Sequence, residues 1–194
     1  MTASDYEALV YRMPGRFGSI KRARIYRDQD SFKRNLNLYV LSEDADGNFM
    51  KSSQLLKNNI KTWLNNHRMI NDTIDILDAR IINIRINFAA VVDYSQDKVE
   101  ALNVALTEIE NMFSQRLDIG QPIYISKIYD ILNNLDEIVD VTNVQITNES
   151  GGRYSDQILN LKEYISADGR ILYAPENTVY ELKYPNLDIK GTIR

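Results

Sequence analysis

Cysteine is absent from this chain of 194 residues, and histidine and tryptophan occur only once each. Without cysteine the chain can form neither a disulfide framework nor a thiolate zinc site, and it has no cysteine nucleophile. A single histidine, His67, would have to serve any catalytic triad. Neither a glycine-rich phosphate-binding loop nor a zinc-protease motif occurs. We therefore expect a protein that is not an enzyme and that uses no metal and no other cofactor.

Long apolar runs are missing as well. No stretch of roughly 18 apolar residues could span a bilayer, and the start MTASDYEALV lacks the basic-then-apolar pattern of a secretory signal. The sequence thus predicts a soluble intracellular protein that does not insert into a membrane.

Positive charge is scarce outside one segment. The chain carries 23 Lys and Arg against 27 Asp and Glu, which gives a formal net charge of −4. Residues 12–34 hold eight of the basic side chains and only two acids. Such asymmetry favours contact with an acidic partner protein. The alternative is nucleic acid, because Phe17, Tyr26 and Phe32 are interleaved with the basic residues as in a stacking-and-phosphate surface, although no named nucleic-acid module matches.

The segment around His67 contains the residue types of an active site. Asp72, Asp75 and Asp78 follow this histidine in the sequence. The β-branched stretch that holds them favours an extended backbone, in which side chains three apart point to opposite faces, so we expect no metal cluster. A calcium loop at residues 42–53 also fails, because serine stands at its first and twelfth positions. We interpret the three aspartates as turn and edge residues.

Hydrophobic periodicity predicts a mixture of strands and helices. Residues 81–92 alternate most clearly, and Ser95 is expected to cap the best helix. A change of apolar phase near Thr142 predicts a β-bulge in the last of these strands. The predicted order is helix 5–13 capped by Thr2 or Ser4, strand 20–27, strand 36–40, turn 46–47, helix 53–66, strand 81–92, helix 95–113, helix 122–135 with Pro122 in its first turn, and strand 139–146. This order predicts an α+β fold with an antiparallel or mixed sheet covered by helices.

The character of the chain changes after Gly151-Gly152. Five of the twelve tyrosines lie in the remaining residues, which predict a hairpin or an extended arm. Such an arm can dock on a partner subunit, or it can pack on its own domain. We predict three parts: residues 1–34 as a helix and basic strand, residues 35–150 as the core domain, and residues 151–194 as the tyrosine-rich arm.

Four segments in their order resemble a known family. They are the strand and turn LNLYVLSEDADGNF, the helix end LNNHRM with the link NDTIDI and an isoleucine-rich strand, the helical runs VEALNVALTEIENMF and IGQPIYISKIYDIL, and the strand VDVTNVQI. In this combination residues 3–147 are similar to the C-terminal part of baseplate J-like wedge proteins of contractile-tailed bacteriophages, in particular the ring-forming wedge proteins of T-even phages. Family members are generally larger, so we expect the chain to be a C-terminal fragment.

The resemblance implies structural work in the virion. Wedge subunits of this family pair, join into a ring around the central hub of the tail baseplate, and change shape when the sheath contracts. We expect a homodimer that contacts other wedge proteins, takes no small-molecule substrate and is assembled in the host cytoplasm. Within this account His67 and Arg68 would cap their helix or bond across the link that follows. The interface residues that we predict are Arg16, Lys21, Arg22, Arg24 and Arg27 of the basic segment, or Tyr173, Tyr180 and Tyr184 of the arm. A nucleic-acid-binding domain that uses residues 12–34 remains the alternative.

Overall fold

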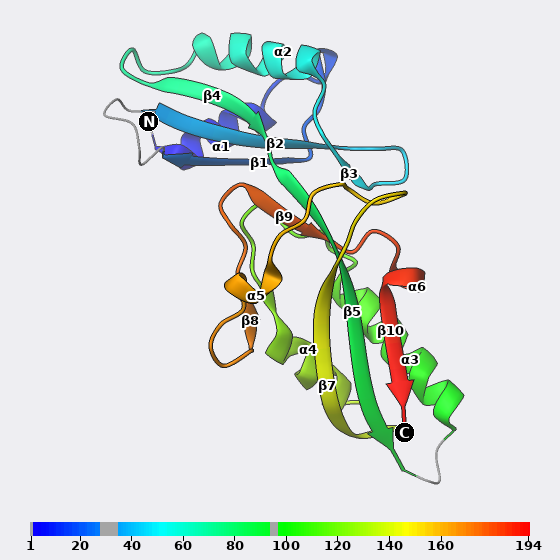
Figure 1. Cartoon of the computed structure of the whole chain (residues 1–194). Helices are drawn as coiled ribbons and strands as arrows, with labels where there is room; N and C mark the ends of the chain where they lie inside the picture. Colours follow the sequence, from blue (N-terminus) through cyan, green and yellow to red (C-terminus); the bar gives the residue numbers. More distant parts are fainter. Residues whose placement is uncertain (1, 28–34, 94–96) are drawn as a thin grey trace. The chain divides into compact units, whose positions relative to one another are not determined.

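A computed structural model describes residues 2–27, 35–93 and 97–194. The fold is α+β, as the sequence predicts. Its contacts divide the chain into two compact units, which we treat separately (Figure 1). Unit 1 is formed by Met1–Arg80 and Glu176–Thr178, and unit 2 by Ile81–Pro175 and Val179–Arg194.

Unit 1 is a small mixed sheet with helices on one face. Strand β2 (Asn35–Glu43) lies between β1 (Arg22–Arg27), which runs antiparallel to it, and β4 (Thr73–Asp78), which runs parallel. The short strand β3 (Phe49–Met50) pairs with the end of β2 after a turn at Gly47, whose positive φ of 78° suits glycine. Helix α1 (Ala3–Tyr11), the 3-10 turn η1 (Gly15–Phe17) and helix α2 (Gln54–Asn65) complete the unit.

Alternating side chains of this sheet create the core of unit 1. Leu36, Leu38 and Val40 of β2 are buried, as their spacing predicts, and pack with the apolar stripes of α1 and α2. Thr2 and Ser53 cap the two helices, because each side-chain oxygen accepts a hydrogen bond from a backbone N–H in the first turn. The two helices therefore cover the same face of the sheet.

Unit 2 is built around the long strand β5 (Arg80–Val92). β7 (Ile138–Glu149) pairs antiparallel with one side of β5, and β10 (Ile189–Ile193) pairs parallel with the other; β9 (Thr178–Glu181) also pairs with β5. Strands β6 (Ile123–Tyr124) and β8 (Ile171–Leu172) form a separate ribbon. The helices of this unit are α3 (Lys98–Met112), α4 (Ile125–Asn133), α5 (Leu161–Tyr164) and α6 (Pro185–Asp188).

The core of unit 2 lies between its sheet and helices α3 and α4 (Figure 1). Even-numbered residues of β5, from Ile82 to Val92, face these helices, which explains the alternation in the sequence. Gly191 of β10 allows close packing here. A Cβ at this position would lie 2.4 Å from Leu102 Cδ1 and 2.4 Å from Phe88 Cζ, far inside van der Waals contact.

Several sequence predictions differ from the structure. The unit boundary falls between Arg80 and Ile81 rather than near residues 34 and 150, because β4 pairs with β2 whereas β5 recruits β10 from the end of the chain. Ser95 lies outside the described residues, and the side chain that caps α3 is that of Asp97. Pro122 is not in a helical first turn, because the short strand β6 precedes α4.

Two further predictions concern the end of the chain. The predicted bulge is confirmed, since the pairing of β5 with β7 passes from Asn143 to Val141 and skips Thr142. Most of the tyrosine-rich segment packs within its own chain, where Leu172, Tyr180 and Ile189 belong to the core of unit 2. In the described part of the chain, no helix is both long enough and apolar enough to cross a membrane.

Candidate protein interface

The outer edge of β1 is sealed by helix α1. The backbone N–H of Ala23 donates to the Tyr11 hydroxyl at 2.9 Å, and that of Ile25 donates to Glu7 Oε1 at 2.9 Å. An unpaired strand edge would offer these donors to any passing strand. Because two side chains of α1 occupy them, this edge presents side chains rather than backbone to a partner.

The exposed basic side chains beside this border are named the basic edge: Arg12, Lys21, Arg24 and Arg27, with the ring of Tyr11. Lys21 lies 3.4 Å from Glu43, and Arg24 lies 3.9 Å from Glu7. These exposed ion pairs partly neutralise the surface and contribute little to stability. Among the described residues Arg12, Arg16 and Arg27 have no carboxylate within ion-pair distance.

Arg22 is the residue of the predicted basic interface that faces inward most. Its Nε is buried, its Nη1 donates to the carbonyl of Lys21 at 2.9 Å, and its guanidinium lies 5.9 Å from the centre of the Phe49 ring. These contacts hold the side chain within unit 1. The structure therefore separates Arg22 from the four exposed basic residues predicted with it.

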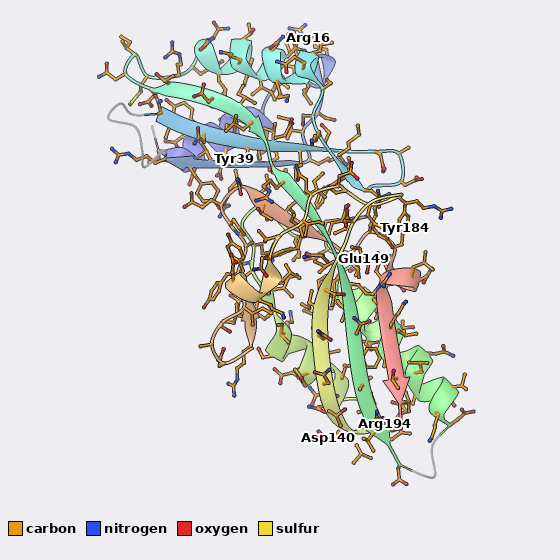
Figure 2. The ribbon with its side chains drawn as sticks, viewed as in Figure 1. Arg16, Tyr39, Asp140, Glu149, Tyr184 and Arg194 are labelled. Carbon is orange, nitrogen blue, oxygen red and sulfur yellow. The ribbon has the colours of Figure 1, made fainter. Side chains whose placement is uncertain are left out.

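Arg16 lies at the 3-10 turn near the start of α2 (Figure 2). Its guanidinium is 4.8 Å from the centre of the Phe17 ring, a cation–π distance. The Phe17 carbonyl accepts from Asn59 Nδ2 at 2.9 Å, which ties the turn to α2. Arginine and exposed aromatic rings are the residues in which protein interfaces are enriched.

The link after α2 is held by a buried carboxylate. Asp72 is fully buried and accepts a hydrogen bond of 2.5 Å from the Tyr6 hydroxyl of α1. Arg68 Nη1 donates to the Asp72 carbonyl, and His67 Nδ1 lies 2.9 Å from the Trp63 carbonyl at the helix end. The roles predicted for His67 and Arg68 are confirmed. Asp72 lies at a turn, as predicted, because its backbone N–H donates to the Met69 carbonyl at 3.1 Å. Its burial was not predicted, because Tyr6 supplies a donor that local sequence does not reveal.

The other two aspartates remain apart from Asp72. Asp75 is exposed, whereas Asp78 pairs with Lys57 Nζ at 2.8 Å and accepts from the backbone N–H of Ser52 at 3.2 Å. In the described residues, no group of three His, Asp or Glu side chains could hold a metal ion.

The predicted tyrosines of the C-terminal segment have three different environments. Tyr180 is only 1% exposed, and its hydroxyl donates to the Tyr173 carbonyl at 2.7 Å. Burial raises the pKa of Tyr180 well above its ordinary value. In this structure Tyr180 is a core residue and cannot reach another chain. Tyr173 is 51% exposed and remains available for contact.

Tyr184 belongs to a cluster around a second buried carboxylate, Asp188. The hydroxyl of Tyr154 donates to Asp188 Oδ1 at 2.5 Å, and the backbone N–H of Tyr184 donates to Oδ2 at 2.9 Å. The two tyrosine rings meet edge to face with centres 5.7 Å apart. Burial, and then the hydrogen bond to Asp188, raises the pKa of Tyr154 to about 12.

A buried polar network fixes β9 against β5. Glu181 is 2% exposed; its Oε2 accepts from Asn83 Nδ2 at 2.8 Å and its Oε1 pairs with Arg116 Nη1 at 3.0 Å. Asn83 Oδ1 accepts from the backbone N–H of Ser155 at 2.7 Å. Sequence reasoning missed this network, because its members are far apart in the chain and lie in segments of unremarkable composition.

Unit 2 also contains a groove of about 640 Å3 beside β7. Aliphatic side chains dominate its lining, among them Ile146, Ile158, Leu159 and Leu161. Lys162 supplies its one charged side chain among the described residues. The groove therefore presents apolar surface rather than an acid–base pair.

Acidic side chains gather in unit 2 where β5 ends and β7 begins, and of these Asp93, Asp136 and Asp140 are exposed. Ile138 pairs with Val92 and Asp140 with Val91, so the side chains of this end come from both strands. We name Asp93, Asp136, Glu137 and Asp140 the acidic end; the exposed Val139 lies among them. Figure 2 shows Asp140 and Arg194 at this same end of the sheet.

Comparison with known proteins identifies the fold. No family model matches the sequence, and no curated protein matches it. The fold is nevertheless similar to that of a solved chain in the cryo-EM structure of the anti-feeding prophage (AFP) baseplate. The TM-score between the present chain and that prophage chain is 0.52, at 10% sequence identity. The match covers 92% of the present chain and 36% of the prophage chain, so the present chain spans about a third of its structural neighbour.

Proposed function

We propose that the chain is a structural subunit of a contractile-tail baseplate, acting as a J-like wedge protein that helps to form the ring around the central hub. The observation that carries this proposal is the shared fold with a chain of the AFP baseplate over 92% of the present chain. The ordered segments between residues 3 and 147 that resemble wedge proteins support it independently. The expected location is the virion tail baseplate, after assembly in the host cytoplasm.

The proposal includes no catalytic role. The buried carboxylates of Asp72, Glu181 and Asp188 each accept hydrogen bonds from groups that join distant segments, which is structural work. A catalytic acid or base would instead be expected beside a cavity that admits substrate. The groove beside β7 has an aliphatic lining and suits contact with protein.

The proposal also includes contacts with a second copy and with other wedge proteins. Arg16, Lys21, Arg24 and Arg27 remain the favoured interface residues of unit 1, and Tyr173 that of unit 2, because these side chains are exposed or partly exposed. Removal of residues 151–194 would not test the arm cleanly, since it would delete part of the core. Tyr173→Ser is the better test, with light scattering as the readout of the homodimer.

The decisive experiment is to locate the chain in assembled particles. An epitope-tagged chain is expressed during assembly, contractile particles are purified on a density gradient, and gold-labelled antibody is imaged. Label at the baseplate end is expected, and particles built from the untagged chain are the control. Label along the sheath or in the head, or its absence from intact particles, would contradict the proposal.

Nucleic acid remains the competing function, supported by three arginines of the basic segment 12–34, Arg12, Arg16 and Arg27, that have no ion-pair partner among the described residues. Labelled DNA and RNA distinguish the two functions. Binding that weakens steeply with salt and is lost in Arg12→Glu/Arg16→Glu would favour the competing function. No shift at low salt is the result that the baseplate proposal predicts.

A further inference from the structure

We propose that the chain associates head to tail: the basic edge of unit 1 in one copy binds the acidic end of unit 2 in the next. This inference rests on the proposed baseplate function and names the partner of one of its surfaces. The argument begins with the unequal charge of the two units. Unit 1 contains 13 Lys and Arg against 11 Asp and Glu, whereas unit 2 contains 10 against 16, which together give the 23 and 27 of the whole chain.

Both the basic edge and the acidic end carry charged side chains that form no ion pair with a described residue. On the basic edge, Arg12 and Arg27 form no ion pair with a described residue. At the acidic end the same holds for Asp136, Glu137 and Asp140. Asp140 Oδ1 does accept a hydrogen bond from the adjacent Val141 N–H, which fixes the carboxylate and does not neutralise it. The two sets therefore complement each other.

Apolar exposure accompanies the charge on both surfaces. Tyr11 is 52% exposed on the basic edge, and Val139 is 65% exposed between Glu137 and Asp140. Phosphate groups would use the arginines alone, whereas a protein surface would also cover the tyrosine ring and the valine. The acidic end of a second copy supplies both kinds of contact, and for this reason we choose it over nucleic acid.

The symmetry of such a contact has a structural consequence. The two surfaces differ, so the contact is heterologous, and a bound pair still offers one unused basic edge and one unused acidic end. Repetition closes a ring if the rotation between copies permits, and otherwise extends a chain. Exposed charge pairs mainly set orientation and association rate, so we expect association that is weak and sensitive to salt.

Charge exchange between two variants tests the contact. Arg12→Glu/Arg27→Glu changes the formal charge of the basic edge from +4 to 0, and Glu137→Lys/Asp140→Lys changes that of the acidic end from −4 to 0. Sedimentation velocity is measured on the full chain at about 0.1 M and about 1 M salt, between which the Debye length falls from about 10 Å to about 3 Å. Wild type is expected to associate at the lower salt and to dissociate at the higher.

Each variant alone is expected to lose association by roughly tenfold or more, because the charge attraction between the two surfaces is then removed. An equal mixture of the two is expected to associate again in pairs, since the unchanged basic edge of one variant can bind the unchanged acidic end of the other. The matched control Lys51→Glu/Lys61→Glu changes unit 1 by the same charge at two exposed sites outside the basic edge and should behave as wild type. Circular dichroism checks that all variants are folded.

Three results would overturn the inference: a wild-type monomer at low salt, variants that associate as wild type does, or a mixture that stays dissociated. Failure of the proposed function is read separately, from the position of the gold label. A chain located at the baseplate with no charge-exchange effect refutes only the head-to-tail contact. If the gold label is absent from particles but the mixture of the two variants regains association, only the baseplate role is refuted.

Discussion

Replacement of Tyr6 by phenylalanine removes one oxygen atom from the interior of unit 1. That oxygen donates to the fully buried Asp72 at 2.5 Å and accepts from the backbone N–H of Met69 at 3.2 Å. Hydrogen bonds to a charged group are worth about 1.5–3 kcal/mol, and a buried group left without its partner retains the cost of desolvation. We therefore expect Tyr6→Phe to lower the free energy of unfolding of unit 1 by about 2 kcal/mol.

The single tryptophan makes the change measurable in unit 1 alone. Trp63 lies in α2, and its Nε1 donates to the Leu9 carbonyl of α1 at 2.8 Å, so its fluorescence reports the packing of these two helices. With a denaturant slope of roughly 1–2 kcal/mol/M in urea, a loss of about 2 kcal/mol moves the fluorescence midpoint down by about 1–2 M. The slope itself should not change.

The control is Tyr26→Phe on β1, because the hydroxyl of this half-buried tyrosine has no hydrogen-bond partner among the described residues. The urea midpoint of this variant should correspond to a free energy of unfolding within about 0.5 kcal/mol of wild type. A double-mutant cycle of Tyr6→Phe with Asp72→Ala then isolates the pair. Equal effects of the two phenylalanine variants, or a coupling below about 0.5 kcal/mol, would refute the assigned role of the hydroxyl.

Three further predictions concern unit 2. Gly191→Ala places a Cβ 2.4 Å from the Phe88 ring and should cost about 1–3 kcal/mol in thermal or urea unfolding followed by circular dichroism; an unchanged midpoint would contradict it. Glu181→Gln leaves Arg116 opposite a neutral group and should cost about 2 kcal/mol in the same assay, whereas no loss would show that the pair is not needed. Tyr154 keeps its proton in the folded state to a pKa of about 12 against an ordinary 10, so unit 2 should lose stability as pH rises between these values. Tyr154→Phe should reduce that loss without abolishing it, because burial also raises the pKa of Tyr180 in the same unit. An unaltered pH dependence in the variant would contradict the assignment.

Helices and strands could be predicted from the sequence where the hydrophobic periodicity and the capping residues agree. Strand β5 shows this best, because six alternating apolar residues leave only one face that can be buried. The bulge at Thr142 could also be predicted, since a shift in apolar phase has no other simple cause in a strand. The sequence predicts Ser95 as the cap of α3, whereas the structure has Asp97, because serine and aspartate serve equally well as caps and only the backbone geometry selects between them.

The candidate interface could be predicted only in part. The charge asymmetry predicts an interface at the basic segment, but composition alone does not show that Arg22 turns inward or that Tyr180 is a core residue. Tyrosine has both an apolar ring and a polar tip, so its presence in a segment fits either a core or an interface. The choice depends on which strands surround it, and these lie far away in the sequence.

By itself, the sequence determined the α+β class, the helix and strand periods, and the exclusion of cysteine chemistry, because each follows from residue type or from spacing within one segment. Tertiary structure alone decided the division into two units, which arises when β5 pairs with a strand about a hundred residues later. It alone decided that Tyr6 meets Asp72 and that Glu181 meets Asn83 and Arg116. A contact between residues that are distant in the chain depends on how whole elements pack, and no local pattern contains that information.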